Sequence, residues 1–85
     1  MNELIYLDMK IWGTEINVDL KFDGTMKVGE LVFRVCDAFE IKCDSFIIIS
    51  KRLKEVLNEK MNFYEQDVFG GDTLILIILA EKEEV

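Results

Sequence analysis

The feature that most constrains this chain is an apolar run in its last quarter. Six consecutive residues, 74–79, are Leu or Ile, and they follow a Gly-Gly-Asp-Thr segment that is typical of a turn. Six residues are far too few to cross a bilayer, which needs about 20. Because successive side chains of a strand point to opposite faces of a sheet, the run predicts a buried strand that is apolar on both faces. Other parts of the chain or a partner must therefore shield both faces of that strand from water.

The size and charge of the chain narrow the classes of function. We expect 85 residues to form one domain, and no segment matches a membrane span or a signal peptide, so we expect a cytoplasmic protein. The 17 acidic against 10 basic residues disfavour binding to nucleic acid and insertion into a membrane. The chain has no His, which is the commonest neutral-pH acid–base group and metal ligand, so the composition disfavours an enzyme.

The first half of the chain predicts a β-hairpin and a helix. Apolar residues occupy positions 5, 7, 9 and 11 and then, after a Trp-Gly link, positions 16, 18, 20 and 22. Two alternating runs joined by a short Gly-containing link are typical of a hairpin. The segment 23–25 is a break that includes a candidate helix cap, after which the apolar period becomes 3.6. We predict one amphipathic helix over residues 27–39, with Phe39 completing its apolar stripe and Phe33 exposed.

The second half adds two strands and a polar connection. Residues 45–50 are β-branched and aromatic and predict a third strand that is apolar on both faces, whereas 53–57 fits either a short strand or a helical turn. A single helix must lie across one face of the sheet, and a right-handed crossover places the last strand in the middle, parallel to the first. We therefore predict an α+β β-grasp roll over residues 1–80, with a mixed sheet of four to five strands and an acidic tail at 81–85.

Two groups of motifs resemble those of ubiquitin-like proteins. The helix stripe Val28-x-x-Leu31-Val32-x-x-Val35 is followed by Ile48 and Tyr64 at consistent spacing. The segment Met61-x-x-Tyr64, followed by Val68-x-x-Gly71-Asp72-x-Leu74, is similar to the L-x-x-Y…I-x-x-G-D-x-L pattern of many such domains, with two extra residues before the Gly-Asp. The resemblance covers nearly the whole chain and implies the ubiquitin-like fold.

Size, acidic balance and the Gly-Asp before the last strand resemble, more specifically, the bacterial YukD/EsaB family. These are ubiquitin-like accessory proteins of the type VII (WXG-type) secretion system. The resemblance implies a non-enzymatic interaction module without a cofactor, whose partners are cytoplasmic domains of the secretion machinery. Conjugated modifiers and sulfur carriers need a C-terminal Gly-Gly, whereas this sequence ends Glu-Glu-Val, so we expect neither. A ubiquitin-like subunit of another bacterial complex is the alternative, and a relative of the carriers or modifiers is a weaker one.

The two cysteines, Cys36 and Cys43, give little support to a catalytic or metal site. A cysteine nucleophile needs an adjacent base, normally His, and a metal site would need two more ligands, for which only carboxylates are on offer. We expect both cysteines to be reduced and structural.

The sheet face opposite the predicted helix is the candidate functional surface. The helix-covered residues are predicted to be Ile5, Leu7, Met9, Val18, Leu20, Phe22, Ile48, Leu74, Leu76 and Ile78. Alternation then sends a second set outward: Tyr6, Ile47, Ile49, Ile75 and Ile77. By resemblance, ubiquitin carries a partner-binding patch on this face, at the positions corresponding to Ile49 and Ile77. Three occupants fit an apolar patch here: a protein partner, a second copy in a homodimer, or the chain's own 53–68 segment.

Overall fold

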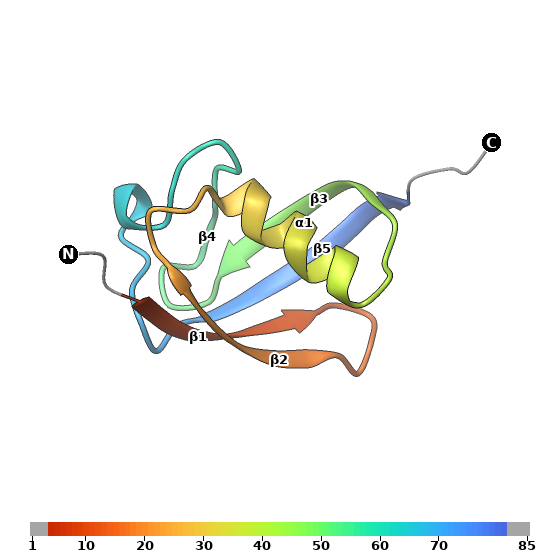
Figure 1. Cartoon of the computed structure of the whole chain (residues 1–85), viewed down its shortest axis with the longest axis horizontal. Coiled ribbons are helices and arrows are strands. Elements are labelled where there is room, and N and C mark those ends of the chain that lie inside the picture. Colours follow the sequence, from red (N-terminus) through yellow and green to blue (C-terminus); the bar gives the residue numbers. More distant parts are fainter. Residues whose placement is uncertain (1–3, 82–85) are drawn as a thin grey trace.

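A computed structural model describes residues 4–81, which form a five-stranded mixed sheet and one main helix. In chain order the elements are β1 (Leu4–Ile11), β2 (Asn17–Asp23), α1 (Val28–Ala38), β3 (Cys43–Ser50), β4 (Glu55–Val56), the short 3₁₀ helix η1 (Tyr64–Gln66) and β5 (Thr73–Glu81). The strand order is β2-β1-β5-β3-β4, with β5 parallel to β1 and antiparallel to β3. Helix α1 crosses one face of the sheet (Figure 1). The predicted β-grasp roll and its central last strand are confirmed.

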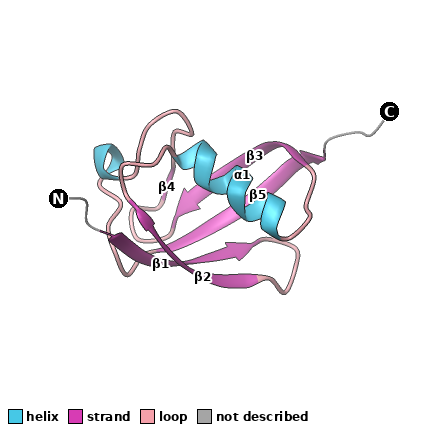
Figure 2. Ribbon diagram, in the orientation of Figure 1, coloured by secondary structure: helices cyan, strands magenta, loops and turns pink. Residues whose placement is uncertain are grey.

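The strands extend further than their apolar patterns. β3 begins at Cys43, two residues before its predicted start, because Cys43 pairs with Glu81 at the end of β5. Backbone pairing does not depend on apolar side chains, so the ladder continues past them. Glu81, expected to begin the acidic tail, therefore belongs to β5, and residues 82–85 lie outside the described residues. The ambiguous 53–57 segment contains the two-residue strand β4, seen beside β3 in Figure 2.

The core lies between α1 and the sheet. The helix contributes Val28, Leu31, Val32, Val35 and Cys36, and most of the predicted helix-covered strand residues are also buried. Val18, Leu20 and Ile78 are only partly buried, and the first two lie on the edge strand β2. The prediction for Phe39 was wrong: this residue follows the last helical turn and is 42% exposed. No helix among residues 4–81 is long and apolar enough to cross a membrane.

The helix cap expected in the 23–25 segment is not used. Asp23 instead accepts hydrogen bonds from the backbone N–H and the hydroxyl of Thr25, so that these groups close a local turn. The first N–H groups of α1 bond to carbonyls of the long connection: Val28 to Met61 at 3.0 Å and Gly29 to Glu59 at 2.9 Å. A tertiary contact thus satisfies donors that a capping side chain would otherwise accept.

The long connection before β5 packs on the helix side of the molecule. Its Leu57, Phe63 and Val68 are buried in the same core as α1, and the Phe63 ring lies 4.7 Å from that of Phe22. The 53–68 segment therefore anchors to the core and does not fold over the opposite face, which removes one of the three proposed occupants of that face.

Candidate functional site on the open face of the sheet

Four isoleucines meet on the sheet face that α1 leaves uncovered. Ile47 pairs directly with Ile77 across β3 and β5, and Ile49 pairs with Ile75. The alternate residues Ile48, Leu74 and Leu76 are almost fully buried under the helix, so these four side chains point the other way. Each of the four is half-buried, because the neighbouring strands lie close together. We call Ile47, Ile49, Ile75 and Ile77 the isoleucine patch.

One further apolar side chain extends this surface, and it was not predicted as part of it. Val56 of β4 pairs with Ile49 and is 63% exposed. Trp12 and Leu79 are also exposed, but they line a different hollow together with the helix-side residues Ile11 and Ile78. A strand long enough to show a regular apolar alternation would have identified such a residue in advance. Val56 carried no such signal, because two residues are too short to show a period.

Tyr6 points to the same face, yet the register of β1 and β5 keeps it away from the isoleucine patch. Ile75 lies beside Lys10 of β1, whereas the carbonyl of Tyr6 accepts a hydrogen bond from the Gly71 N–H, before β5 begins. Asp8 therefore separates the ring from the patch. Tyr6 instead has the ammonium of Lys21 5.4 Å above its ring, which is a cation–π contact with β2. Of the five expected site residues, the fold brings four together and sets the tyrosine apart.

Charged side chains border the patch on its β1 side. Asp8 lies directly opposite Asp19 on β2, and both are on the open face. A hydrogen bond with the Asp19 carboxyl, together with some desolvation and repulsion from that same group, raises the pKa of Asp8 above its usual value. Lys10 lies between this acidic pair and the isoleucines. The surface therefore changes within one strand from apolar to charged.

A buried hydrogen-bond network fixes the two strands that carry the patch. The Asp72 carboxylate is 3% exposed and accepts a 2.5 Å hydrogen bond from the Ser50 hydroxyl. Its other oxygen accepts from the backbone N–H groups of Arg52 at 3.0 Å and Thr73 at 2.7 Å. The network ties the end of β3 to the start of β5, one residue from Ile49 and three from Ile75.

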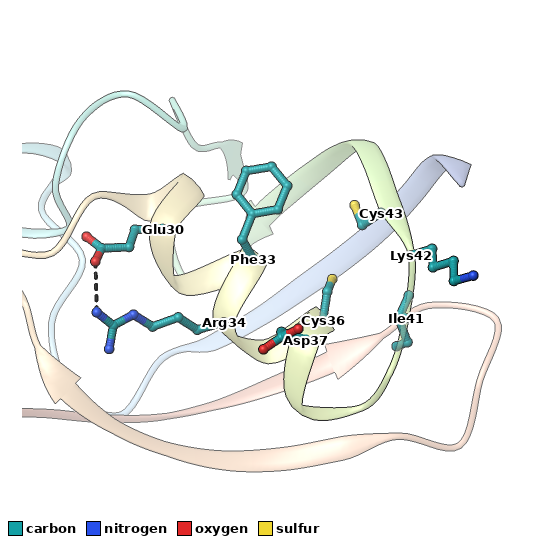
Figure 3. A pocket seen from close by; sticks show the side chains of 8 residues that line it. All are labelled: Glu30, Phe33, Arg34, Cys36, Asp37, Ile41, Lys42 and Cys43. Carbon is teal, nitrogen blue, oxygen red and sulfur yellow. Dashed lines mark hydrogen bonds and ion pairs between the residues drawn. The ribbon is translucent and has the colours of Figure 1, made fainter. Parts of the chain in front are cut away.

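A hollow of about 490 Å³ lies apart from the isoleucine patch, between α1 and the start of β3 (Figure 3). Cys36 and Cys43 line it as free thiols, beside the Arg34–Glu30 ion pair. Burial, with a smaller effect from Cys43, raises the pKa of Cys36 to about 11. A nucleophilic thiol needs the opposite shift. Within residues 4–81, no group of three potential ligands is arranged to hold a metal ion.

Comparisons with known proteins show the fold. No family model and no curated protein matches this sequence. Ubiquitin of Caldiarchaeum subterraneum aligns with a TM-score of 0.79 at 17% identity, over 95% of this chain and 100% of that one. The ubiquitin-like domain of Plasmodium falciparum Dsk2 gives 0.72 at 20% identity, over 88% and 97%. The C-terminal ubiquitin-like domain of mouse tubulin-specific chaperone e gives 0.72 at 12% identity, over 98% and 94%. The chain has the ubiquitin-like β-grasp fold.

Proposed function

We propose that this protein is a non-enzymatic protein–protein interaction module that binds its partner through the isoleucine patch. The observation that carries the proposal is the pairing of Ile47 with Ile77 and of Ile49 with Ile75 on a face that no described element covers. Apolar surface of this kind, bordered by charged side chains such as Lys10, is characteristic of interaction sites. Tyr6, which is 59% exposed on the same face, would contact only a partner that extends along β1.

The finer proposal is an accessory or regulatory component of a bacterial type VII secretion system, acting in the cytoplasm. Its support is the resemblance of the sequence to the YukD/EsaB family: small size, net acidity, and a Gly-Asp that precedes the last strand. In this proposal the folded domain, residues 4–81, is the interaction module, and the partners are cytoplasmic domains of the membrane machinery. A neighbouring gene for an FtsK-like ATPase and genes for small WXG proteins would support this role over that of a subunit of another complex.

The test is a paired substitution on the patch. Ile49→Asp with Ile77→Asp places two carboxylates where the partner would bury two isoleucines. Because full burial of one such side chain contributes about 1.5–3 kcal/mol, we expect binding to fall at least a hundredfold. The fold should survive, since both side chains are half-buried on the uncovered face and neither belongs to the buried core. Asn17→Asp, which adds a carboxylate on the same face of β2, is the matched control and should bind like the wild type.

The binding assay is a pull-down with purified cytoplasmic domains of the secretion machinery, with circular dichroism as the check on folding. Equal binding by the double variant and the wild type would contradict the role of the patch. Loss of the folded spectrum would show that the two side chains belong to a core. Sedimentation velocity tests the remaining possibility, which is a homodimer. A dimer that dissociates in the double variant would assign the patch to a second copy of the chain.

A further inference from the structure

The outer edge of β3 is paired along only a small part of its length. β4 pairs with Ile49 and Ser50, and the N–H of Leu57 bonds to the Ile48 carbonyl at 2.8 Å. The chain then leaves the sheet for the start of α1, where the Glu59 carbonyl accepts from Gly29. Among residues 4–81, no strand continues beside residues 44–47 (Figure 1). An eight-residue strand thus has a two-residue neighbour on this side.

The regular part of this edge offers a short row of backbone groups. The Ile48 carbonyl faces β4, and successive residues of a strand direct their backbone groups to opposite sides. The N–H and C=O of Phe46 and the N–H of Ile48 therefore face outward, and no backbone partner for them exists within the described chain. A shift in register at Ser45 ends the ladder, so the row is short. Groups of this kind are a template for an added strand.

Apolar side chains border the row on both sides. Phe46 packs toward the core, and Phe33 of α1, 50% exposed, meets its ring edge-on with centroids 5.8 Å apart. On the opposite side lie Ile47, which is a member of the isoleucine patch, and Val56, which pairs with another member, Ile49. An added strand would direct alternate side chains toward these two surfaces.

The charge of the edge defines the partner further. A hollow of about 280 Å³ follows the edge, and the only charged residues among those that line it are Asp44 and Glu59. Asp44 lies at the start of β3, and Glu59 follows β4. A second copy of this chain, with a net charge of −7, would bring the same carboxylates against these two. A segment with basic residues would neutralise them.

We propose that the edge of β3 at residues 44–48 binds an extended peptide segment that has alternating apolar side chains flanked by Lys or Arg, and that this segment continues the sheet in line with β4. The binding is strand addition, in which backbone hydrogen bonds supply affinity and the flanking surfaces supply specificity. This site shares Ile47 with the isoleucine patch, but the backbone edge of β3 defines it, and it does not rest on the function proposed for the patch.

The first test uses a fluorescein-labelled peptide of sequence Lys-Val-Thr-Val-Thr-Val-Lys and the wild-type protein. We expect saturable binding by fluorescence anisotropy and slower amide exchange at Phe46 and Ile48. Two versions N-methylated at alternate residues are matched controls, because only one set of amides can face β3. One version should bind at least tenfold more weakly, since it loses backbone hydrogen bonds, and the other should bind normally. Equal effects of the two versions would overturn strand addition.

The second test exchanges the charges. Asp44→Lys with Glu59→Lys should weaken binding of the basic peptide at least tenfold. A peptide with Glu at both ends should then bind more tightly than the basic one. Glu15→Lys with Asp19→Lys adds the same charge at the β2 side of the sheet and should leave the preference for Lys unchanged. An unchanged preference in the first variant would overturn the proposal. So would protection of the Phe46 and Ile48 amides in a peptide-free dimer, which would assign the edge to a second copy. If the variant with Asp44→Lys and Glu59→Lys does not fold, the comparison of the two N-methylated peptides on the wild-type protein decides between strand addition and its absence.

Discussion

The hydrogen bond between Ser50 and Asp72 permits a quantitative test of how this fold is held in register. Both side chains are buried, at 0% and 3% exposed, and the bond joins the last residue of β3 to the residue that precedes β5. Asp72 also accepts from the N–H groups of Arg52 and Thr73. Asp72→Ala therefore removes three hydrogen bonds to one anion and leaves the Ser50 hydroxyl and the Arg52 N–H without their acceptor.

The expected cost follows from these contacts. A hydrogen bond to a charged group contributes about 1.5–3 kcal/mol, but removing the carboxylate also removes the unfavourable burial of its charge. We expect Asp72→Ala to lower the free energy of unfolding by about 3 kcal/mol, which for a domain of this size is a fall in Tm of roughly 12–24 °C. Asp72→Asn keeps one acceptor oxygen and should cost about 1–2 kcal/mol. Ser50→Ala should cost a similar amount, since the Leu53 N–H also loses its acceptor.

The assay is urea unfolding followed by circular dichroism for the wild type, the two Ala variants and the double variant. Because Ser50 and Asp72 act on one bond, the double variant should be more stable than additivity predicts, by about 1–2 kcal/mol. The m-value, which is the slope of the free energy of unfolding against urea concentration, should not change, because the substitutions leave the fold unchanged. A coupling energy below about 0.3 kcal/mol would refute the reasoning, as would a cost of Asp72→Ala no greater than that of a surface substitution, about 0.5 kcal/mol.

Three further outcomes are expected. Gly24→Ala should cost about 1–3 kcal/mol in chemical unfolding, because the new methyl would lie 2.5 Å from an isoleucine side chain, whereas at Gly70 the nearest atom is 3.5 Å away and Ala should be nearly neutral. Asp19→Asn should lower the NMR titration midpoint of Asp8 and raise Tm at pH 7 but not at pH 3, since the raised pKa of Asp8 gives a stability that is lost as pH rises through it. Iodoacetamide at pH 8 should modify Cys36 about a hundredfold more slowly in the folded protein than in urea, because a pKa of about 11 in place of 9.0 depletes the thiolate; similar rates would contradict this burial.

Local periodicity was sufficient for most of the fold. The change from period two to period 3.6 between Phe22 and Val28 is a local property, so the hairpin and the helix could be predicted from it. The two-residue strand β4 could not, because its existence depends on pairing with β3. The helix N-terminus was assigned the wrong cap for a similar reason. Its N–H groups bond to carbonyls about thirty residues later in the chain, and only the folded chain brings those carbonyls near.

The face to which each candidate residue points could be predicted from the sequence, but the set of residues that lie together on that face could not. Alternation correctly sent Ile47, Ile49, Ile75 and Ile77 to the face opposite the helix, and it sent Tyr6 there as well. Whether outward side chains touch depends on how far one strand is shifted along the next. A parallel pair such as β1 and β5 is joined by a long crossover, so no tight turn fixes that shift. Tyr6 was therefore predicted on the correct face but wrongly beside the four isoleucines.

Both proposed binding surfaces exist because α1 and β4 are too small to cover the whole sheet. At about 1.5 Å per residue, the 11 residues of α1 span roughly 16 Å, whereas the nine residues of β5 span roughly 30 Å. One such helix can protect a single face of the central strands, so a β5 that is apolar on both sides leaves the isoleucine patch. Likewise, the two residues of β4 protect only one end of the outer edge of β3. Ile47 belongs to both surfaces, since it pairs with Ile77 on the face and lines the hollow along the edge. A single partner with a strand beside β3 and an apolar element beneath β5 would cover both at once.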